Sequence, residues 1–138
     1  LHAELNVAIA LVPRGPYSPA VLAQMERGIE SWSGEYSDPP FTYTVSVRVL
    51  PYPAARGELA VVPVFGRHRA NRVGASAVRG AGILLARHDA FYAQSLWAHE
   101  FAHNLGLEHS GTFQQGITGY HPRAEIRGWE VGAVVRAY

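Results

Sequence analysis

Residues 99–109 read H-E-F-A-H-N-L-G-L-E-H, and they are the most informative part of the sequence. Two histidines four positions apart on a helix point about 40° from each other and lie roughly 6 Å apart along its axis. His99 and His103 can therefore reach the same ion. Gly106 can adopt a positive φ angle, which ends the helix and turns the chain back, so that His109 becomes a third nitrogen ligand.

The number of protein ligands indicates what kind of metal site this is. Three histidines leave one position of a tetrahedral zinc ion open for water, as in catalytic rather than structural sites. Glu100 projects about 100° further around the helix than His99, close enough to contact that water without binding the metal. Because zinc lowers the pKa of bound water, we predict one catalytic zinc ion with Glu100 as the general base. The alternative is a buried helix whose histidines bond only to the backbone and whose Glu100 is solvated.

The sequence around the first two histidines is typical of an amphipathic helix. Residues 90–105 contain neither proline nor glycine, and Asp89 is a candidate N-cap. The residues that we expect on the buried side are Phe91, Leu96, Ala98, Phe101, Ala102 and Leu105. We therefore predict that one helix carries both His99 and His103.

The spacing of these residues resembles that of a known clan of enzymes. His99, Glu100, His103, Gly106 and His109 match every fixed position of H-E-x-x-H-x-x-G-x-x-H, the signature of the metzincin zinc metallopeptidases. The resemblance implies that the three histidines bind zinc and that Glu100 is the general base. It also implies an endopeptidase, which hydrolyses internal peptide bonds of proteins.

The metzincins also carry a methionine turn beneath the metal, commonly S-x-M-x-Y, and here the chain departs from the pattern. The nearest counterpart is residues 116–120, G-I-T-G-Y. Tyr120 matches the tyrosine and is a candidate catalytic residue that donates a hydrogen bond to the oxyanion. Thr118 stands in place of the methionine, and the only methionine, Met25, is expected in the core. The floor of the site and the subfamily are therefore left open.

Composition excludes several other classes of protein. A chain of 138 residues, 48% of them hydrophobic, is expected to form a single domain, here residues 1–138. The net charge of +1 gives no electrostatic case for binding nucleic acid or an anionic membrane. Without cysteine the chain has neither thiolate ligands nor disulfides. We expect a secreted monomer. Abundant Ala, Arg, Gly and Val are typical of a GC-rich genome, so we also expect a bacterial origin.

Periodicity predicts the remaining elements. Strands are expected at residues 3–12, 41–50, 58–65, 73–79 and 82–87. A helix begins at Pro19, with Ser18 as N-cap, and runs to about Trp32. Residues 33–40 are predicted to form a turn, and Pro63 indicates an edge strand or a bulge. The residues that could line a C-terminal helix within 122–138 are Ile126, Trp129, Ala133 and Val134, although Gly128 and Gly132 weaken it.

This order of elements predicts an α+β fold with a twisted, mixed and mostly parallel sheet. A backing helix and an active-site helix pack on the sheet, as the resemblance to metzincins also implies. Residues 1–106 would form an N-terminal subdomain and residues 107–138 a short C-terminal one. An edge strand at residues 73–78 could pair with an extended peptide substrate. By the same resemblance, residues 110–120 would line the main side-chain pocket.

Three hypotheses about function are compatible with these residues. The first is a compact secreted zinc endopeptidase. The second is a zinc-binding interaction domain that keeps the ligands but has no turnover; the missing methionine favours it, whereas the presence of Glu100 disfavours it. The third is a narrowly specific processing protease or toxin that uses the same chemistry on a single protein.

Overall fold

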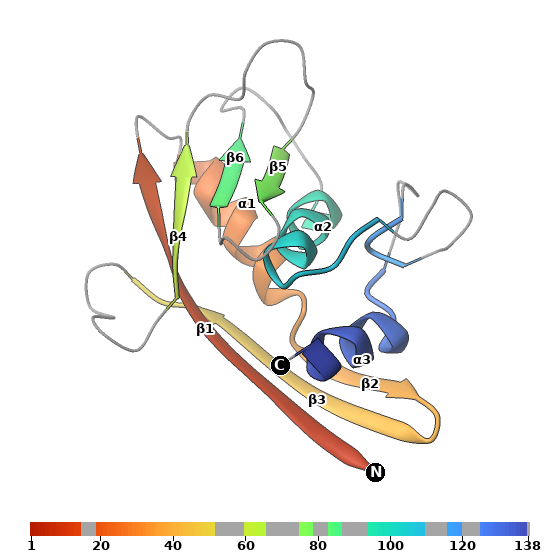
Figure 1. Ribbon diagram of the computed structural model, residues 1–138. Helices are drawn as coiled ribbons and strands as arrows, with labels where there is room; N and C mark the ends of the chain where they lie inside the picture. Colours follow the sequence, from red (N-terminus) through yellow and green to blue (C-terminus); the bar gives the residue numbers. More distant parts are fainter. Residues whose placement is uncertain are drawn as a thin grey trace.

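The computed structural model describes residues 1–14, 19–51, 60–65, 75–78, 83–86, 94–109, 116–119 and 125–137 (Figure 1). The strands are β1 (His2–Arg14), β2 (Gly34–Asp38), β3 (Phe41–Val49), β4 (Ala60–Phe65), β5 (Ala75–Val78) and β6 (Ile83–Ala86). The helices are α1 (Pro19–Glu30), α2 (Gln94–Asn104) and α3 (Gly128–Ala137). The predicted N-caps, Ser18 and Asp89, lie outside the described residues.

The described strands form one mixed sheet in the order β2-β3-β1-β4-β6-β5. The pairs β1–β3, β1–β4 and β4–β6 are parallel, whereas β2–β3 and β5–β6 are antiparallel. Along β3, Tyr43, Val45 and Val47 are buried in the same core as residues of all three helices. Because side chains of a strand alternate between faces, the helices share one face of this part of the sheet. The mixed sheet and its helices confirm the predicted α+β class.

The long strand β1 connects two halves of the sheet. Among the described residues, it pairs with β3 through His2–Ile9 and with β4 through Ile9–Arg14, so that both partners meet at Ile9. Helix α2 contacts β5 and β6 in one half, and α3 contacts β2 and β3 in the other (Figure 1). The two helices that build the candidate site are therefore supported by different halves of one sheet.

The prediction of a turn at residues 33–40 is wrong. Most of this segment is β2, which pairs antiparallel with β3 from Gly34↔Val45 to Asp38↔Phe41. The turn itself is restricted to Pro39 and Pro40. Of the side chains of β2, only Tyr36 packs against the core. A short edge strand with a single packed apolar residue has no hydrophobic alternation by which to recognise it.

The prediction of an edge or a bulge at Pro63 is also wrong. Strand β4 lies between β1 and β6, and its register with β1 continues without interruption from Ile9↔Ala60 to Arg14↔Phe65. On the other side, the residues of β4 that pair with β6 in the described part of the chain are Val64 and Phe65. Pro63 therefore lies before this second ladder begins, where its missing N–H group breaks no pairing with β6.

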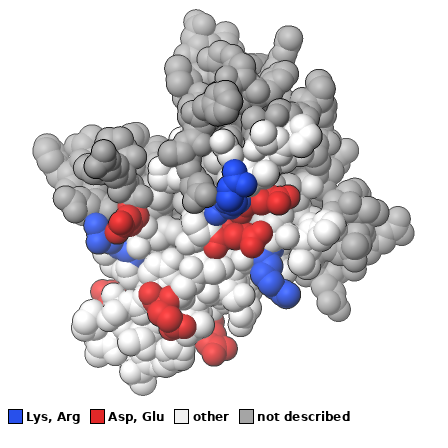
Figure 2. Space-filling view, turned by 180° about the vertical axis from the view of Figure 1, so that it is seen from behind, with Lys and Arg blue, Asp and Glu red and all other residues white. Residues whose placement is uncertain are grey.

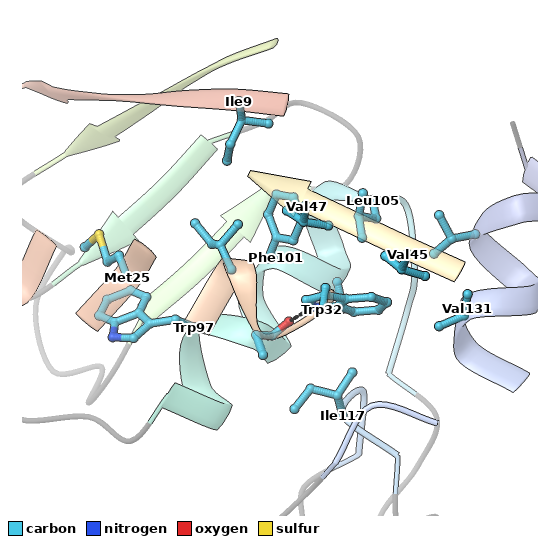
Figure 3. Packing of buried hydrophobic residues seen from close by; sticks show 14 of the residues in the cluster. Ile9, Met25, Trp32, Val45, Val47, Trp97, Phe101, Leu105, Ile117 and Val131 are labelled. Carbon is cyan, nitrogen blue, oxygen red and sulfur yellow. Dashed lines mark hydrogen bonds between the residues drawn. The ribbon is translucent and has the colours of Figure 1, made fainter. Parts of the chain in front are cut away.

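Large side chains from the helices fill the core, and Trp32 links two of them. Its indole Nε1 donates a hydrogen bond of 3.0 Å to the carbonyl of Ala98, which joins the end of α1 to α2. Met25 is fully buried in the hydrophobic core (Figure 3), so the prediction that it belongs to the core is confirmed. Trp97, which was not expected on the buried side, is 0% exposed, as is Trp32.

Helix α3 confirms the predicted C-terminal helix but differs in which residues it buries. Trp129 is 39% exposed, whereas Glu130 is 0% exposed. The glycines that argued against a helix are explained by close packing on the sheet. A Cβ atom at Gly128 would collide with the backbone of Ser37, and one at Gly132 would lie 2.9 Å from the Tyr43 hydroxyl.

The charged residues of the described surface are mixed in sign. On the face shown in Figure 2, acidic and basic side chains lie next to one another, without a continuous basic area among the described residues. In the part of the chain that the structure describes, none of the helices combines the length and the apolar character needed to cross a bilayer.

Candidate metal centre

Helix α2 holds the first two histidines rigidly because its other sides are buried. Trp97 and Phe101 are 0% and 2% exposed, and both belong to the core. His99 and His103 occur on successive turns of the helix and are half-buried. The expected buried residues Ala98, Phe101, Ala102 and Leu105 are confirmed, whereas Leu96 is only half-buried and Phe91 lies outside the described residues. With so much of α2 packed, its histidines have little freedom to move relative to the core.

The end of α2 brings the third histidine to the first two, as predicted. Gly106 has a φ of 99°, and its N–H group donates to the carbonyl of His103 at 3.0 Å. The N–H group of Leu107 donates to the carbonyl of Ala102, also at 3.0 Å. These two bonds form a Schellman motif, which needs the left-handed backbone that glycine adopts easily. The chain then reverses, and His109 lies against the other two imidazoles.

The three imidazoles converge through the same ring nitrogen. The Nε2 atoms of His99, His103 and His109 form a triangle with all three sides equal to 3.2 Å. The rings of His99 and His103 are perpendicular, at 90°, and those of His103 and His109 are nearly so, at 84°. The three rings therefore aim their Nε2 atoms at a common point.

Backbone carbonyls determine which nitrogen of two of these rings carries the proton. Nδ1 of His99 bonds to the carbonyl of Ile117, and Nδ1 of His103 bonds to the carbonyl of Leu107 at 2.7 Å. A carbonyl oxygen only accepts hydrogen bonds, so each Nδ1 must be the donor. In the neutral rings, Nε2 then carries a lone pair that points into the triangle. This is the tautomer that binds metals, and such outer bonds orient metal-binding histidines.

The three histidines are close enough to hold a metal ion. A tetrahedral zinc ion with Zn–N distances of about 2.0–2.1 Å places its nitrogen ligands about 3.3–3.4 Å apart. The observed 3.2 Å sides of the triangle fit this value closely. An all-nitrogen set of ligands also suits other divalent ions, so the geometry indicates a metal site without selecting the metal. His99 and His103 do bond to the backbone, as the alternative hypothesis expected, but through the nitrogen that leaves Nε2 available.

Of the two predicted catalytic residues, Glu100 and Tyr120, only Glu100 lies within the described residues. Glu100 follows His99 on α2 and is 6% exposed, so it is not the solvated residue of the alternative hypothesis. Tyr120 lies outside the described residues, as does most of the segment 110–120 that was predicted to line the main pocket.

The four described residues of that segment form a turn below His99. The N–H group of Gly119 donates to the carbonyl of Gly116 at 3.0 Å. Thr118, at the position where metzincins have methionine, is 1% exposed, and its hydroxyl donates to the carboxylate of Glu130 at 2.7 Å. Glu130 is not among the site residues that the sequence predicts. Its local signal is weak, because it is the third residue of α3 and accepts from the N–H of Arg127 as in a capping box, but Arg127 is not a usual N-cap.

Burial makes two of the imidazoles harder to protonate. It lowers the pKa of His99 below the ordinary value of 6.5, and repulsion from His103 and His109 adds to this effect. The bond to Ile117 and the negative charge of Glu130 act in the opposite direction without reversing the shift. Burial also lowers the pKa of His109, with a contribution from His103. Both rings therefore stay neutral, ready to bind metal, at a lower pH than free histidine.

These pKa values predict how the stability of the metal-free protein depends on pH. Below 6.5 the unfolded chain binds protons that the folded His99 resists, so protonation favours unfolding. The free energy of unfolding is therefore expected to be highest above 6.5 and to fall as the pH decreases toward the folded-state pKa. Urea denaturation measures this free energy, in the presence of a chelator and at several pH values between about 7.5 and about 5.5. The variant His99→Gln should show a shallower decline, and an equally steep one would contradict the shift.

Comparisons with known proteins do not assign the chain to a family. No model of a protein family matches the sequence, and no curated protein is significantly similar to it. The case for a function therefore depends on the residues of the site.

Proposed function

We propose that the chain is a zinc-dependent endopeptidase of the metzincin type. The observation that supports this most strongly is the convergence of three Nε2 atoms at 3.2 Å from one another, two of them on rings whose Nδ1 atoms are held by carbonyls. His99, His103 and His109 would hold the ion. Glu100, which directly follows His99 on α2, would be the general base.

The residues of the chain divide the chemistry among them. When bound, zinc would activate water and polarise the carbonyl of the scissile peptide bond. Glu100 would accept the proton of the attacking water and deliver it to the nitrogen of the leaving amine. Tyr120 would donate a hydrogen bond to the oxyanion, a role that rests on the resemblance alone. His99 and His103 stay in place during these steps because the carbonyls of Ile117 and Leu107 orient their rings.

The sheet supports an extended substrate. Strand β5 lies at the edge of the described sheet and is in contact with α2. The outer side of an edge strand carries backbone groups that can pair with an additional strand. A peptide added along β5 would pass beside the helix that carries His99 and His103, which would bring a peptide bond of the substrate to the ion. We also propose that the enzyme is a secreted, monomeric bacterial protein.

A cleavage experiment with a chelator tests this function. The purified protein, loaded with zinc, is incubated with a peptide mixture derived from a proteome, and the products are identified by mass spectrometry. We expect new termini at internal peptide bonds, which disappear when a chelator is added and return when zinc is restored. The number of different sites then separates a general endopeptidase from a narrowly specific processing protease or toxin.

Two outcomes of the same experiment would contradict the proposal. A protein that binds zinc tightly but yields no cleavage of peptides or folded proteins would be the zinc-binding interaction domain. Cleavage that persists in the presence of the chelator would indicate a contaminating protease or a different mechanism.

A further inference from the structure

The carboxylate of Glu130 bonds to two consecutive residues of the turn at 116–119, Ile117 and Thr118, and to the residue before α3, Arg127. Oε1 accepts from the N–H group of Ile117 at 2.8 Å and from that of Arg127 at 2.9 Å. Oε2 accepts from the N–H group of Thr118 at 2.8 Å and from the hydroxyl of the same residue at 2.7 Å. Glu130 is 0% exposed. Four donors on two oxygens match an ionised carboxylate, which only accepts hydrogen bonds.

Two of the bonds at this turn share a single peptide group. The carbonyl of Ile117 and the N–H group of Thr118 belong to one planar unit, in which they point in opposite directions. Glu130 accepts from the N–H end of this unit, and Nδ1 of His99 donates to its carbonyl end. Rotation of this peptide group would break both bonds. Its orientation therefore couples Glu130 to the ring of His99.

We propose that Glu130 is a positioning residue of the metal centre, which acts on His99 through the peptide group between Ile117 and Thr118. The negative acceptor at the N–H end polarises the peptide and strengthens its carbonyl as an acceptor for His99. A stronger bond at Nδ1 fixes the ring and makes Nε2 a better ligand, as carboxylates do when they bond directly to metal-binding histidines. The inference rests on the proposed metal centre and assigns Glu130 a role there.

The surrounding residues fit this arrangement. A Cβ atom at Gly116 would lie 2.6 Å from Cδ and Oε1 of Glu130, so only glycine lets the carboxylate approach the turn this closely. The side chain of Ile117 is 1% exposed and belongs to the core (Figure 3), which anchors the turn independently of Glu130. The hydroxyl of Thr118 is bound to Glu130. The carbonyl of Ile117 is thus held in place and contacts the candidate ligand His99. This carbonyl belongs to the segment that corresponds to the methionine turn of metzincins.

The affinity for zinc tests the role of Glu130 without the use of any substrate. In Glu130→Gln, one carboxylate oxygen is replaced by an amide NH₂ group, which cannot accept from the donors of the turn. We expect this variant to bind Zn²⁺ about tenfold more weakly in competition with a chromophoric chelator. The visible absorption of the Co²⁺ form is expected to change as well, because it reports the geometry of the ligands. Glu125→Gln is the matched control, since Glu125 is exposed and loses the same charge; it should bind Zn²⁺ like the parent.

A second variant separates the position of the carboxylate from its charge. Gly116→Ala keeps Glu130 but forces its carboxylate away from the turn, so it should also weaken Zn²⁺ binding. If Glu130→Gln does not fold, the Zn²⁺ affinity of Gly116→Ala tests the role of Glu130 in its place. Folded variants with the parental Zn²⁺ affinity and the parental Co²⁺ spectrum would overturn the proposal and reduce Glu130 to a residue that only stabilises the fold.

The positioning role of Glu130 and the endopeptidase activity can be tested separately. If the parent cleaves no peptide while Glu130→Gln binds Zn²⁺ more weakly, the endopeptidase is wrong and the positioning role stands. If the parent is an active peptidase and Glu130→Gln keeps its metal affinity and spectrum, the positioning role is wrong and the endopeptidase stands.

Discussion

Replacement of Glu100 by glutamine is expected to lower the rate of peptide hydrolysis by a factor of about 10²–10⁴, the usual contribution of a general base. Glutamine has nearly the same shape as glutamate but cannot accept a proton from water. The side chain of Glu100 is 6% exposed, and so a variant of equal size avoids the cavity that alanine would create. Zinc content and thermal stability should stay close to those of the parent, because the three histidines are unchanged.

Glu108 provides a matched control for this prediction. It directly precedes His109, just as Glu100 directly follows His99, but it is exposed. Glu108→Gln should therefore hydrolyse peptides at a rate within about twofold of the parent, since surface substitutions have small effects. Initial rates under saturating zinc compare the two variants. Turnover by Glu100→Gln that equals that of Glu108→Gln would exclude Glu100 as the base.

Replacement of His109 by alanine is expected to weaken zinc binding by at least about a hundredfold and to abolish hydrolysis. Loss of an outer hydrogen-bond partner of a ligand costs 10–100-fold in affinity, and loss of the ligand itself should cost more. His109 is exposed and follows the end of α2, so this substitution removes a ligand without disturbing the core. Elemental analysis and chelator competition measure the loss.

The control for this variant is a histidine outside the candidate centre. His2 is exposed on β1 and bonds to the hydroxyl groups of Thr42 and Thr44. His2→Ala should keep the parental zinc affinity. If His109→Ala binds zinc as tightly as His2→Ala does, the triangle of Nε2 atoms is not the metal site.

The cluster of three histidines could be predicted from the sequence because its arrangement is local. His99 and His103 are on one helix, and the turn that returns His109 needs only Gly106, whose φ is 99°. Regular spacing on a helix and a glycine after it are properties of neighbouring residues. The main strands and helices were predictable for the same reason, since their apolar residues alternate or recur with a clear period.

The features that the sequence did not reveal depend on contacts between distant segments. His99 bonds to a carbonyl 18 positions away, and Glu130 bonds to an N–H group 13 positions away. A glutamate in the first turn of a helix is usually solvated, whereas this one is buried and bonds to Ile117 and Thr118. Strand β2 was missed because its pairing with β3, rather than an apolar pattern of its own, defines it.

The two carbonyls that orient His99 and His103 come from different segments of the chain, so the centre cannot be transferred to another protein as a single segment. A copy of residues 94–109 grafted onto the helix of another protein would carry all three imidazoles, together with the Leu107 carbonyl that orients His103. It would lack the carbonyl of Ile117, and the ring of His99 would be free to rotate. A designer who wished to reproduce this site would have to supply an acceptor from a second segment of the host scaffold, and not only the eleven-residue motif.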